Sequence, residues 1–330
     1  MTRLATIAEA FAATRGMLPA SEARLLLAHV MGKPAAWLLA HDEQTLPAET
    51  LTAFQALLQR RAAGEPVAYL LGRREFYGRD FSVSPAVLIP RPETELLVEF
   101  ALRKVGAGEA TGKTTAQQEG AGQNPARFAV DALQGGRAKN AQLCRPGLSA
   151  SRGGLLAVAD GDTATILDLG AGSGCIAITL ALECPGAQVT AIDASPAALA
   201  VAQENARRLA PQATVRFLAS DWFSALAGER FDLIVSNPPY IAAADPHLAQ
   251  GDLRHEPRTA LASGADGLDA IANIIALAPE HLTPGGGLWL EHGYDQAAAV
   301  RALLAAAGFT AIEQHRDLAG IVRISGGRRK

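Results

Sequence analysis

From Thr165 onward, short apolar runs rich in β-branched residues alternate with helical patterns, and this alternation constrains the fold more than any other feature. Such a sequence predicts a mostly parallel sheet whose strands are joined by right-handed crossovers. The expected strands span residues 165–169, 188–193, 214–219, 231–236 and 288–291. The expected helices span residues 174–183, 196–209, 266–281 and 296–307. Two final segments, 309–315 and 321–325, are expected to end this α/β sheet with an antiparallel strand.

A glycine-rich loop, Gly170-Ala171-Gly172-Ser173-Gly174, lies between the first expected strand and the helix that follows it. Its glycines permit a tight turn and a close approach of the backbone to a ligand. The spacing is Gly-x-Gly-x-Gly, whereas dinucleotide-binding folds carry Gly-x-Gly-x-x-Gly, although NAD binding stays open on this loop alone. The loop therefore predicts a ligand site at the carboxyl end of the strand.

The next two strands end in residues that suit a nucleoside. Asp193 ends the second strand about twenty residues after the glycine loop, where a carboxylate can bind ribose hydroxyls. Asp221 and Trp222 follow the third strand, and we expect them beside an adenine. Ser195 and Pro196 are a plausible N-cap and first-turn proline for the following helix. These positions predict a nucleoside pocket at one edge of the sheet.

Asn237-Pro238-Pro239-Tyr240 directly follows the apolar strand at 231–236. The two prolines can neither extend a strand ladder nor begin a helix from within, so they predict an extended loop. The Asn237 side chain and the Pro238 carbonyl can both accept hydrogen bonds, and Tyr240 offers a flat ring. Such a loop is a receptor for a planar –C(=X)–NH2 group, whose nitrogen is presented edge-on to an electrophile. A proline-rich turn that merely ends a strand is the alternative.

Taken together, these motifs resemble the class I S-adenosylmethionine-dependent methyltransferases and, more narrowly, the peptide chain release factor glutamine methyltransferases (the HemK/PrmC family). The resemblance covers nearly the whole chain and includes residues 64–72, 75–78, 89–99, 168–174, 221–223, 237–240 and 256–261. Asn-Pro-Pro-Tyr alone is shared with DNA amino-methyltransferases. The Arg91–Glu95 signature, together with the Glu65–Gly72 stretch, is far more specific.

The resemblance implies a Rossmann-like, seven-stranded and mostly parallel sheet with S-adenosyl-L-methionine as the cofactor. It implies methyl transfer to the side-chain amide nitrogen (N5) of the glutamine in the Gly-Gly-Gln motif of class I release factors, which are the expected partners. Cofactor contacts are expected from Gly170, Ala171, Gly172, Ser173, Gly174, Asp193, Asp221, Trp222 and Asn237. Catalysis is expected from Asn237, Pro238 and Tyr240, and substrate binding from Asn237, Pro238, Pro239 and Tyr240.

Several polar residues near these motifs can be interpreted in two ways. They either contact a ligand or support the fold, and the choice stays open for Arg91, Glu93, Glu95, Glu256 and Arg258. Glu291 follows a late strand close to the site in topology, and we interpret it as support for the fold.

The first 72 residues predict a small helical bundle, with apolar residues at helical spacing and helices at 21–30, capped by Ser21, and at 51–63. The resemblance favours a role in substrate recognition over simple stabilisation. Residues 73–90 predict a β-hairpin with a turn at 78–80, which links the bundle to a methyltransferase domain at 91–330. Within that domain, the Gly-, Ala-, Gln- and Ser-rich segment at about 106–162 is expected to be a mostly disordered insertion.

The charge of the chain bears on its substrate. The formal net charge is −3, whereas enzymes that act on duplex DNA usually carry a basic field. A DNA adenine or RNA guanine amino-methyltransferase is nevertheless the main alternative, and a basic surface beside Tyr240 would favour it. A non-catalytic regulator that only binds the cofactor is a weaker alternative, because it has no need of the Asn237–Tyr240 receptor. Nucleic acid is not expected as a substrate.

The cysteines and the hydropathy of the chain bear on its environment. Three cysteines at irregular spacing argue against a disulfide framework and a zinc site, so no metal is expected. The chain has no apolar run of membrane-spanning length and no signal peptide, so we expect a cytoplasmic monomer without a membrane partner.

Overall fold

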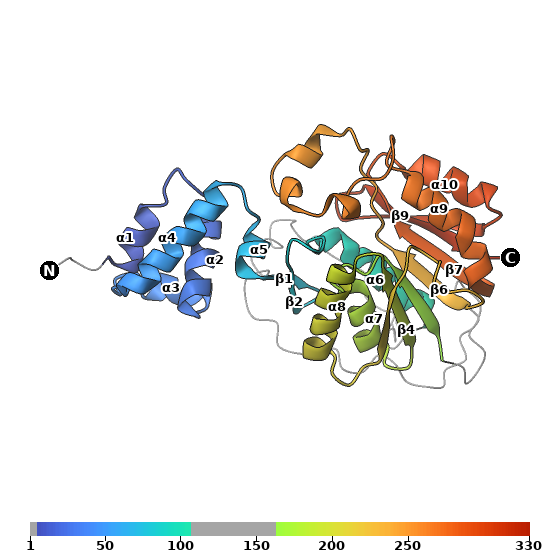
Figure 1. Cartoon of the computed structure of the whole chain (residues 1–330), viewed down its shortest axis with the longest axis horizontal. Helices are drawn as coiled ribbons and strands as arrows, with labels where there is room; N and C mark the ends of the chain where they lie inside the picture. The colour runs from blue at the N-terminus through green and yellow to red at the C-terminus, as the bar shows by residue number, and fades with distance from the viewer. Residues whose placement is uncertain (1–4, 107–162) are drawn as a thin grey trace, which may run out of the picture.

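The computed structural model describes residues 5–106 and 163–330 (Figure 1). A small helical unit at the N-terminus is joined through a two-stranded hairpin to a larger α/β unit. The insertion expected at about 106–162 lies outside the described residues, except for Gly106 at its start. Within the described ranges, no helix is both long enough and apolar enough to span a bilayer.

The N-terminal unit is a bundle of short helices around its own apolar core. The helices are α1 (Ile7–Ala12), α2 (Ala20–Met31), α3 (Ala35–Ala40), α4 (Ala48–Ala62) and α5 (Val67–Leu71). Leu26, Leu38 and Phe54 are buried at its centre. Ser21 does not cap α2, contrary to the prediction, because the helix begins one residue earlier, after Pro19. The fixed φ of proline presets this entry into the helix without a side-chain cap.

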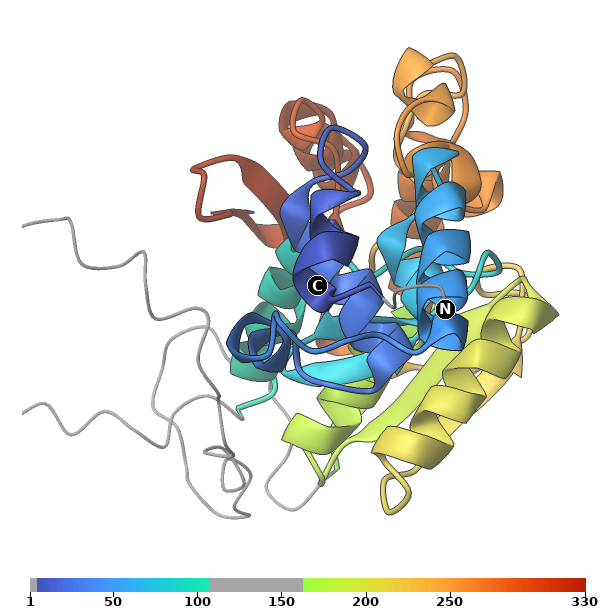
Figure 2. The same cartoon turned by 90° about the vertical axis from the view of Figure 1, so that its left-hand side faces the viewer.

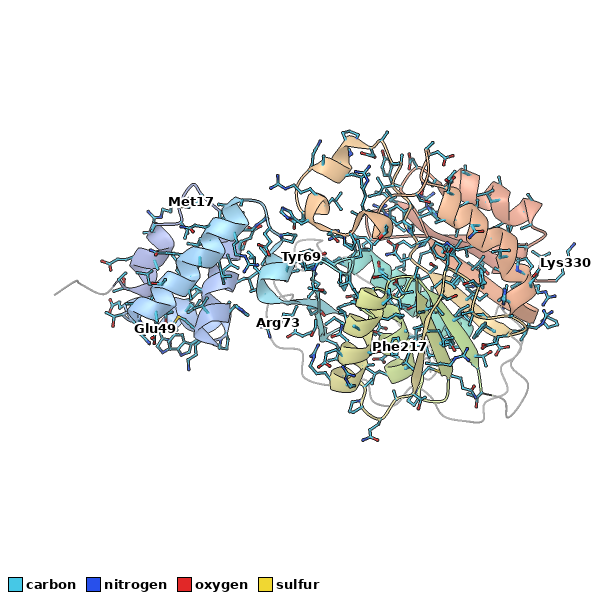
Figure 3. All side chains as sticks on the ribbon, in the orientation of Figure 1. Met17, Glu49, Tyr69, Arg73, Phe217 and Lys330 are labelled. Carbon is cyan, nitrogen blue, oxygen red and sulfur yellow. The ribbon has the colours of Figure 1, made fainter. Side chains whose placement is uncertain are left out.

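The hairpin of β1 (Arg73–Phe76) and β2 (Arg79–Ser82) connects the bundle to the α/β unit. Its turn consists of Tyr77 and Gly78, both with positive φ, so it is shorter than the expected turn at 78–80. Such two-residue turns match the right-handed twist of the paired strands. The connection also buries Tyr69 of α5, whose hydroxyl donates to the Val87 carbonyl at 2.7 Å, and Figure 3 shows Tyr69 at this junction.

In the described part of the chain the central sheet has seven strands, and all except β9 run parallel to one another, as predicted. The strands are β3 (Thr165–Leu169), β4 (Gln188–Asp193), β5 (Val215–Ala219), β6 (Phe231–Ser236), β7 (Leu282–Glu291), β8 (Thr310–Arg316) and β9 (Val322–Arg328). Their spatial order is β5-β4-β3-β6-β7-β9-β8. The chain therefore turns back between β3 and β6, and ligands of open α/β sheets bind at such a reversal.

Helices cover both faces of the sheet (Figure 1). One face carries α6 (Glu95–Lys104), α7 (Cys175–Glu183) and α8 (Pro196–Leu209), and the other carries α9 (Asp269–Leu277) and α10 (Ala297–Ala306). A 3-10 turn, η1 (Pro92–Thr94), precedes α6. Between β6 and α9 the chain makes three further 3-10 turns at Pro246–Ala249, Leu253–His255 and Arg258–Ala260. This segment stands out from the sheet in Figure 2.

Two elements differ from their expected bounds. The strand β7 begins at Leu282, which pairs with Phe231, so the glycines at 285–287 lie inside the strand and not in a turn before it. A register irregularity in the β6–β7 pairing absorbs this glycine run. The helix expected at 266–281 ends as an α-helix at Leu277 and continues as a 3-10 turn, because Pro279 cannot donate a helical hydrogen bond.

Candidate active site

A cavity of about 500 Å³ lies at the carboxyl ends of the parallel strands. Its volume falls within the roughly 300–1,000 Å³ typical of small-molecule sites. The predicted site residues that line it are Gly170, Gly172, Asp193, Asp221, Trp222, Asn237 and Pro239. These residues come from four loops that are distant in the sequence, and the parallel sheet brings them together.

A larger cavity of about 810 Å³ lies at the opposite end of the sheet, beside Thr165 and Gln188, where β3 and β4 begin. It contains none of the predicted site residues. We assign the ligand to the smaller cavity, because open α/β sheets bind ligands at the carboxyl ends of their strands.

The glycines of the loop have different tasks. A methyl group built on Gly172 would meet no atom within 4 Å, so its backbone lies open to the cavity, and its φ is +54°. A methyl group on Gly174 would come within 2.8 Å of Ile178 Cδ1 and 3.1 Å of Ala202 Cβ. Gly174 therefore permits the close packing of α7 against α8, and it does not line the cavity.

Two further loop residues also lie away from the cavity. Ala171 and Ser173 are buried, and neither lines the cavity. The Ser173 carbonyl accepts a hydrogen bond from Asn205 Nδ2 at 2.9 Å, and the same side chain pairs with both backbone groups of Ser82. The buried Asn205 thus ties the glycine loop to the hairpin, a function that its sequence context does not signal.

Asp193 lies at the end of β4 with its carboxylate bonded to the backbone on both sides. Its Oδ2 accepts from the Gly172 amide at 2.9 Å, and its Oδ1 accepts from the Ser195 amide at 2.8 Å. An ionised carboxylate has about four acceptor sites, so acceptor capacity remains for hydroxyl groups of a ligand. Ser195 caps α8 by accepting from the Ala198 amide at 3.2 Å, and Pro196 opens the helix, as predicted.

Trp222 occupies a strained position beside Asp221. Its φ is +47°, a conformation that costs a non-glycine residue about 1–2 kcal/mol. The Ser220 hydroxyl donates to the Trp222 carbonyl at 2.7 Å and accepts from the Ala225 amide at 3.0 Å, which holds the turn. The strain is tolerated where the half-buried indole forms part of the cavity wall.

Asp168 lies at the base of the glycine loop and is completely buried. Its Oδ2 accepts from the Ala177 amide at 3.1 Å, whereas its Oδ1 has no hydrogen-bond partner among the described residues. Burial raises the pKa of this carboxyl to about 7. Asp168 itself does not line the cavity, so it supports the glycine loop from behind.

The Asn237–Tyr240 loop forms one edge of the cavity. Asn237 Nδ2 donates to Thr94 Oγ1 at 3.0 Å. No described residue donates a hydrogen bond to Asn237 Oδ1 or to the Pro238 carbonyl. Asn237 and Pro239 line the cavity, whereas Pro238 and Tyr240 do not. The Tyr240 hydroxyl donates to Glu291 Oε1 at 3.3 Å, and burial raises the pKa of this phenol.

Two buried residues that the sequence motifs did not identify stand behind this loop. Thr94, in the turn η1, donates from Oγ1 to Glu291 Oε2 at 2.7 Å. Glu291 ends β7, is only 2% exposed, and contacts both Thr94 and Tyr240. Burial raises its pKa to about 7. Its position at a strand end was the one sequence signal for Glu291, and Thr94 had none beyond its place in the Arg91–Glu95 signature.

Four of the five residues whose roles were left open make polar contacts within the protein. Arg91 forms an ion pair with the buried Glu256, which also accepts from the Ile89 amide at 2.9 Å. Glu95 accepts from the Tyr77 amide at 2.9 Å, and Arg258 donates to the Ala243 carbonyl at 2.7 Å. Glu93 is exposed. The Arg91–Glu256 pair holds the chain just before Pro257 and Thr259, which line the cavity.

Comparison with known proteins places this site in a family context. Two family models match the chain, the PrmC N-terminal domain over residues 4–72 and the methyltransferase small domain over residues 154–264. The release factor glutamine methyltransferase of Bordetella pertussis is 50% identical over 94% of this chain and 95% of that protein. Its counterpart in Burkholderia pseudomallei is 47% identical, with 94% and 92% covered. A protein-(glutamine-N5) methyltransferase of Alicyclobacillus acidocaldarius, known from its crystal structure, is 28% identical, with 76% and 99% covered and a TM-score of 0.37.

Proposed function

This chain belongs to the family of release factor glutamine methyltransferases, which depend on S-adenosylmethionine, and we propose that it methylates N5 of the glutamine in the Gly-Gly-Gln motif of class I release factors at the Asn237–Tyr240 loop. The observation that carries this proposal is the pair of free acceptors in this loop: Oδ1 of Asn237, a residue that lines the cavity, and the carbonyl of the neighbouring Pro238. A primary amide offers two N–H donors on one nitrogen and matches this pair.

The residues of the cavity fit S-adenosylmethionine. Asp193 offers acceptors for the ribose hydroxyls, and Asp221 with the Trp222 indole forms a wall suited to the adenine. The open backbone at Gly172 leaves room for the zwitterionic amino-acid end of the cofactor. The bound cofactor supplies an electrophilic methyl group on its sulfonium. Asn237 would contact both the cofactor and the substrate, since it lines the cavity and belongs to the loop.

The chemistry demands orientation of a poor nucleophile. The lone pair of an amide nitrogen is delocalised into the carbonyl, so it reacts only when it is aimed along the transfer direction. Asn237 Oδ1 and the Pro238 carbonyl accept the two amide hydrogens and favour partial positive charge on the nitrogen. The Tyr240 ring packs against the amide plane and excludes water. Such orientation and electrostatic stabilisation can supply roughly several kcal/mol of the barrier reduction.

Cofactor binding is expected to depend on Asp193. In Asp193→Ala the ribose acceptor disappears, and each lost charge-assisted hydrogen bond costs roughly 1.5–3 kcal/mol, so affinity should fall about tenfold or more. Gly172→Ala should also weaken binding, because it places a methyl group in the cavity at a positive φ. Calorimetry with S-adenosylmethionine measures both affinities, and wild-type values in the two variants would contradict the assignment of the nucleoside pocket.

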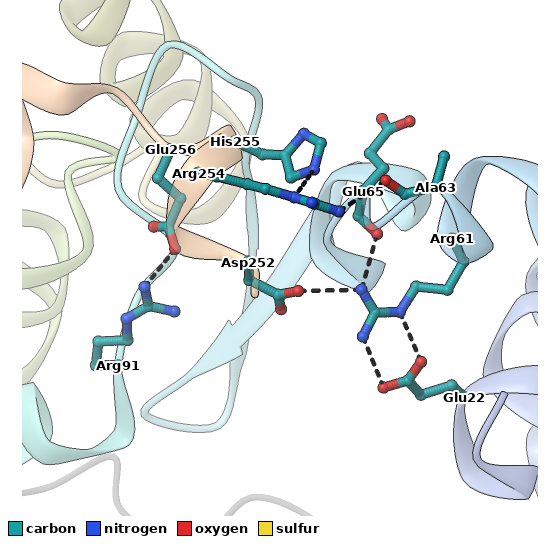
Figure 4. A network of polar contacts seen from close by, with 9 residues as sticks. All are labelled: Glu22, Arg61, Ala63, Glu65, Arg91, Asp252, Arg254, His255 and Glu256. Carbon is teal, nitrogen blue, oxygen red and sulfur yellow. Dashed lines mark hydrogen bonds and ion pairs between the residues drawn. The ribbon is translucent and has the colours of Figure 1, made fainter. Parts of the chain in front are cut away.

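We further propose that residues 1–72 recognise the release factor, that residues 73–90 link the two units, and that residues 91–330 form the methyltransferase domain. The support is a polar network between the bundle and the segment that leads from Tyr240 to the cavity wall (Figure 4). Arg61 pairs with Glu22 at 2.6 Å inside the bundle and with Asp252 at 3.0 Å across the junction. Arg254 donates to the Ala63 carbonyl at 2.7 Å. The bundle is thereby held in one orientation relative to the site.

Breaking the Arg61–Asp252 pair is expected to weaken recognition of the intact release factor. A partly exposed ion pair typically contributes about 0.2–1 kcal/mol, so Asp252→Ala should raise KM for the release factor by about 1.5- to fivefold, with little change in cofactor affinity. Arg60→Ala is the matched control, because Arg60 pairs with Glu65 within the bundle. Steady-state kinetics decide the matter, and an equal KM in wild type and Asp252→Ala would contradict this role of the junction.

The alternative substrate is a nucleobase, since Asn-Pro-Pro-Tyr also suits the amino group of adenine or guanine. The net charge of −3 favours a protein substrate instead. We propose that the enzyme acts on it as a monomer in the cytoplasm, where release factors work. The test is incubation with labelled S-adenosylmethionine and, separately, a release factor, DNA and ribosomal RNA. We expect label on the release factor alone. Label on nucleic acid, with none on the release factor, would overturn the proposal, and no label on any of the three would favour a non-catalytic regulator.

A further inference from the structure

A continuous chain of hydrogen bonds, buried at its centre and partly buried at its two ends, runs behind the Asn237–Tyr240 loop. Asn237 Nδ2 donates to Thr94 Oγ1 at 3.0 Å, and Thr94 Oγ1 donates to Glu291 Oε2 at 2.7 Å. The other Glu291 oxygen accepts from the Tyr240 hydroxyl at 3.3 Å. These hydrogen bonds join the turn η1, the end of β7 and the loop after β6, so three segments that are distant in the sequence meet behind the Asn237 side chain.

The chemistry of these groups determines which one donates and which one accepts in each of these hydrogen bonds. An ionised carboxylate only accepts hydrogen bonds, so Glu291 obliges the Thr94 hydroxyl to donate to it. The Thr94 oxygen is then left to accept, and only the Nδ2 end of the Asn237 amide can donate. The amide is therefore held with Nδ2 toward Thr94 and with Oδ1 on the opposite side, where a substrate amide requires an acceptor.

We propose that Thr94 is a positioning residue that holds the Asn237 amide with its oxygen, and not its nitrogen, toward the substrate. This inference rests on the proposed function, because it concerns the acceptor that the glutamine amide needs. A reversed Asn237 would present N–H groups to the N–H groups of the substrate and repel it. Without a partner behind it, the amide has no reason to keep the productive direction.

The surroundings of Glu291 determine the pH at which its carboxylate is ionised and acts only as an acceptor. Burial raises its pKa to about 7, whereas Thr94, Tyr240 and the positive charge of Arg323 lower the pKa. The exposed Glu93 raises it. The Glu291 carboxyl is therefore mainly ionised at pH 8.5, which is a suitable pH for testing these donor and acceptor roles.

The experiment compares Thr94→Val, which replaces the hydroxyl with a methyl group of similar shape, and Thr94→Ser, which keeps the hydroxyl. Each is measured at pH 8.5 with an intact release factor and S-adenosylmethionine. The cofactor affinity is measured by calorimetry, and kcat is normalised to the number of cofactor-binding sites, so unfolded protein does not enter the rate. The same Thr94→Val change is also made in an Asn237→Ala background.

We expect Thr94→Val to lower kcat about tenfold, because the reactive complex then holds an unpaired amide nitrogen. Cofactor affinity should stay within about twofold, and Thr94→Ser should retain kcat within about threefold. In the Asn237→Ala background, Thr94→Val should lower kcat by less than about twofold, because two residues that act through one contact are not additive.

Three results would overturn the inference while leaving the proposed function intact. They are a kcat of Thr94→Val within about twofold of wild type, an equal loss in Thr94→Ser and Thr94→Val, and an undiminished Thr94→Val effect in the Asn237→Ala background. A wild-type enzyme that transfers no methyl group to the release-factor glutamine would overturn the proposed function, and the inference with it.

Discussion

Asn237→Ala is expected to lower kcat on a release factor by roughly 10²-fold or more, with a smaller loss of cofactor affinity. Removing one preorganised group that stabilises charge developing in a transition state commonly costs about this much. Asn237 lines the cavity and offers one of the two free acceptors of the loop, so its removal leaves one N–H of the substrate amide without a partner.

The measurement is single-turnover methyl transfer at saturating cofactor, together with calorimetric binding of S-adenosylmethionine. Asn237 also lines the cavity, so a modest loss of affinity is expected. A matched control is Asn205→Ala, which disturbs the anchor of the glycine loop and should affect cofactor binding first. Unchanged turnover in Asn237→Ala would remove this residue from the catalytic assignment.

Changing the glutamine of the Gly-Gly-Gln motif to Glu or Ala should abolish methyl incorporation into the release factor. The proposed receptor, the Asn237–Tyr240 loop, presents two acceptors, Asn237 Oδ1 and the Pro238 carbonyl, and therefore requires two donors on one nitrogen. An ionised Glu has no donor and is repelled by both oxygens, and Ala presents no reactive group. The glycines before the glutamine have no side chains, so the backbone can come close enough for the glutamine side chain to reach Tyr240.

Mass spectrometry of the modified release factor decides this prediction. One added methyl group on the motif glutamine is expected for the unchanged factor, and none for the Glu and Ala variants. An intact release factor should also be methylated faster than a short peptide, since the bundle at 1–72 would add contacts distant from the amide. Methyl incorporation that persists in the Ala variant would show that another residue is the acceptor.

The sequence was sufficient for the residues whose chemistry follows from local pattern. Glycines, prolines and short apolar runs predicted the strands, and the rule that ligands bind at the carboxyl ends of parallel strands grouped Gly172, Asp193, Trp222 and Asn237. The structure places these four around one cavity. The cap at Ser195 was equally local and was predicted correctly, because capping involves only neighbouring residues.

Prediction failed where two local signals competed. A glycine triplet ordinarily indicates a turn, yet the glycines at 285–287 lie within β7, because pairing with β6 outweighs their weak strand propensity. Ser21 is a good capping residue, but Pro19 already determines where α2 begins. In both cases a neighbouring constraint decided between conformations that the local sequence permits.

By itself, the sequence determined which residues stand at the ends of the strands, and hence the part of the cavity wall that these strand ends form, because strand and turn preferences act over a few neighbouring positions. The segments at 86–88 and 257–260 also line the cavity, and only the tertiary structure brings them there. Only the tertiary structure decided which side chains stand behind the site. Thr94, Tyr240 and Glu291 meet through one carboxylate although Thr94 and Glu291 are 197 positions apart. Buried polar groups must find hydrogen-bond partners wherever the fold places them, and no local pattern records that choice.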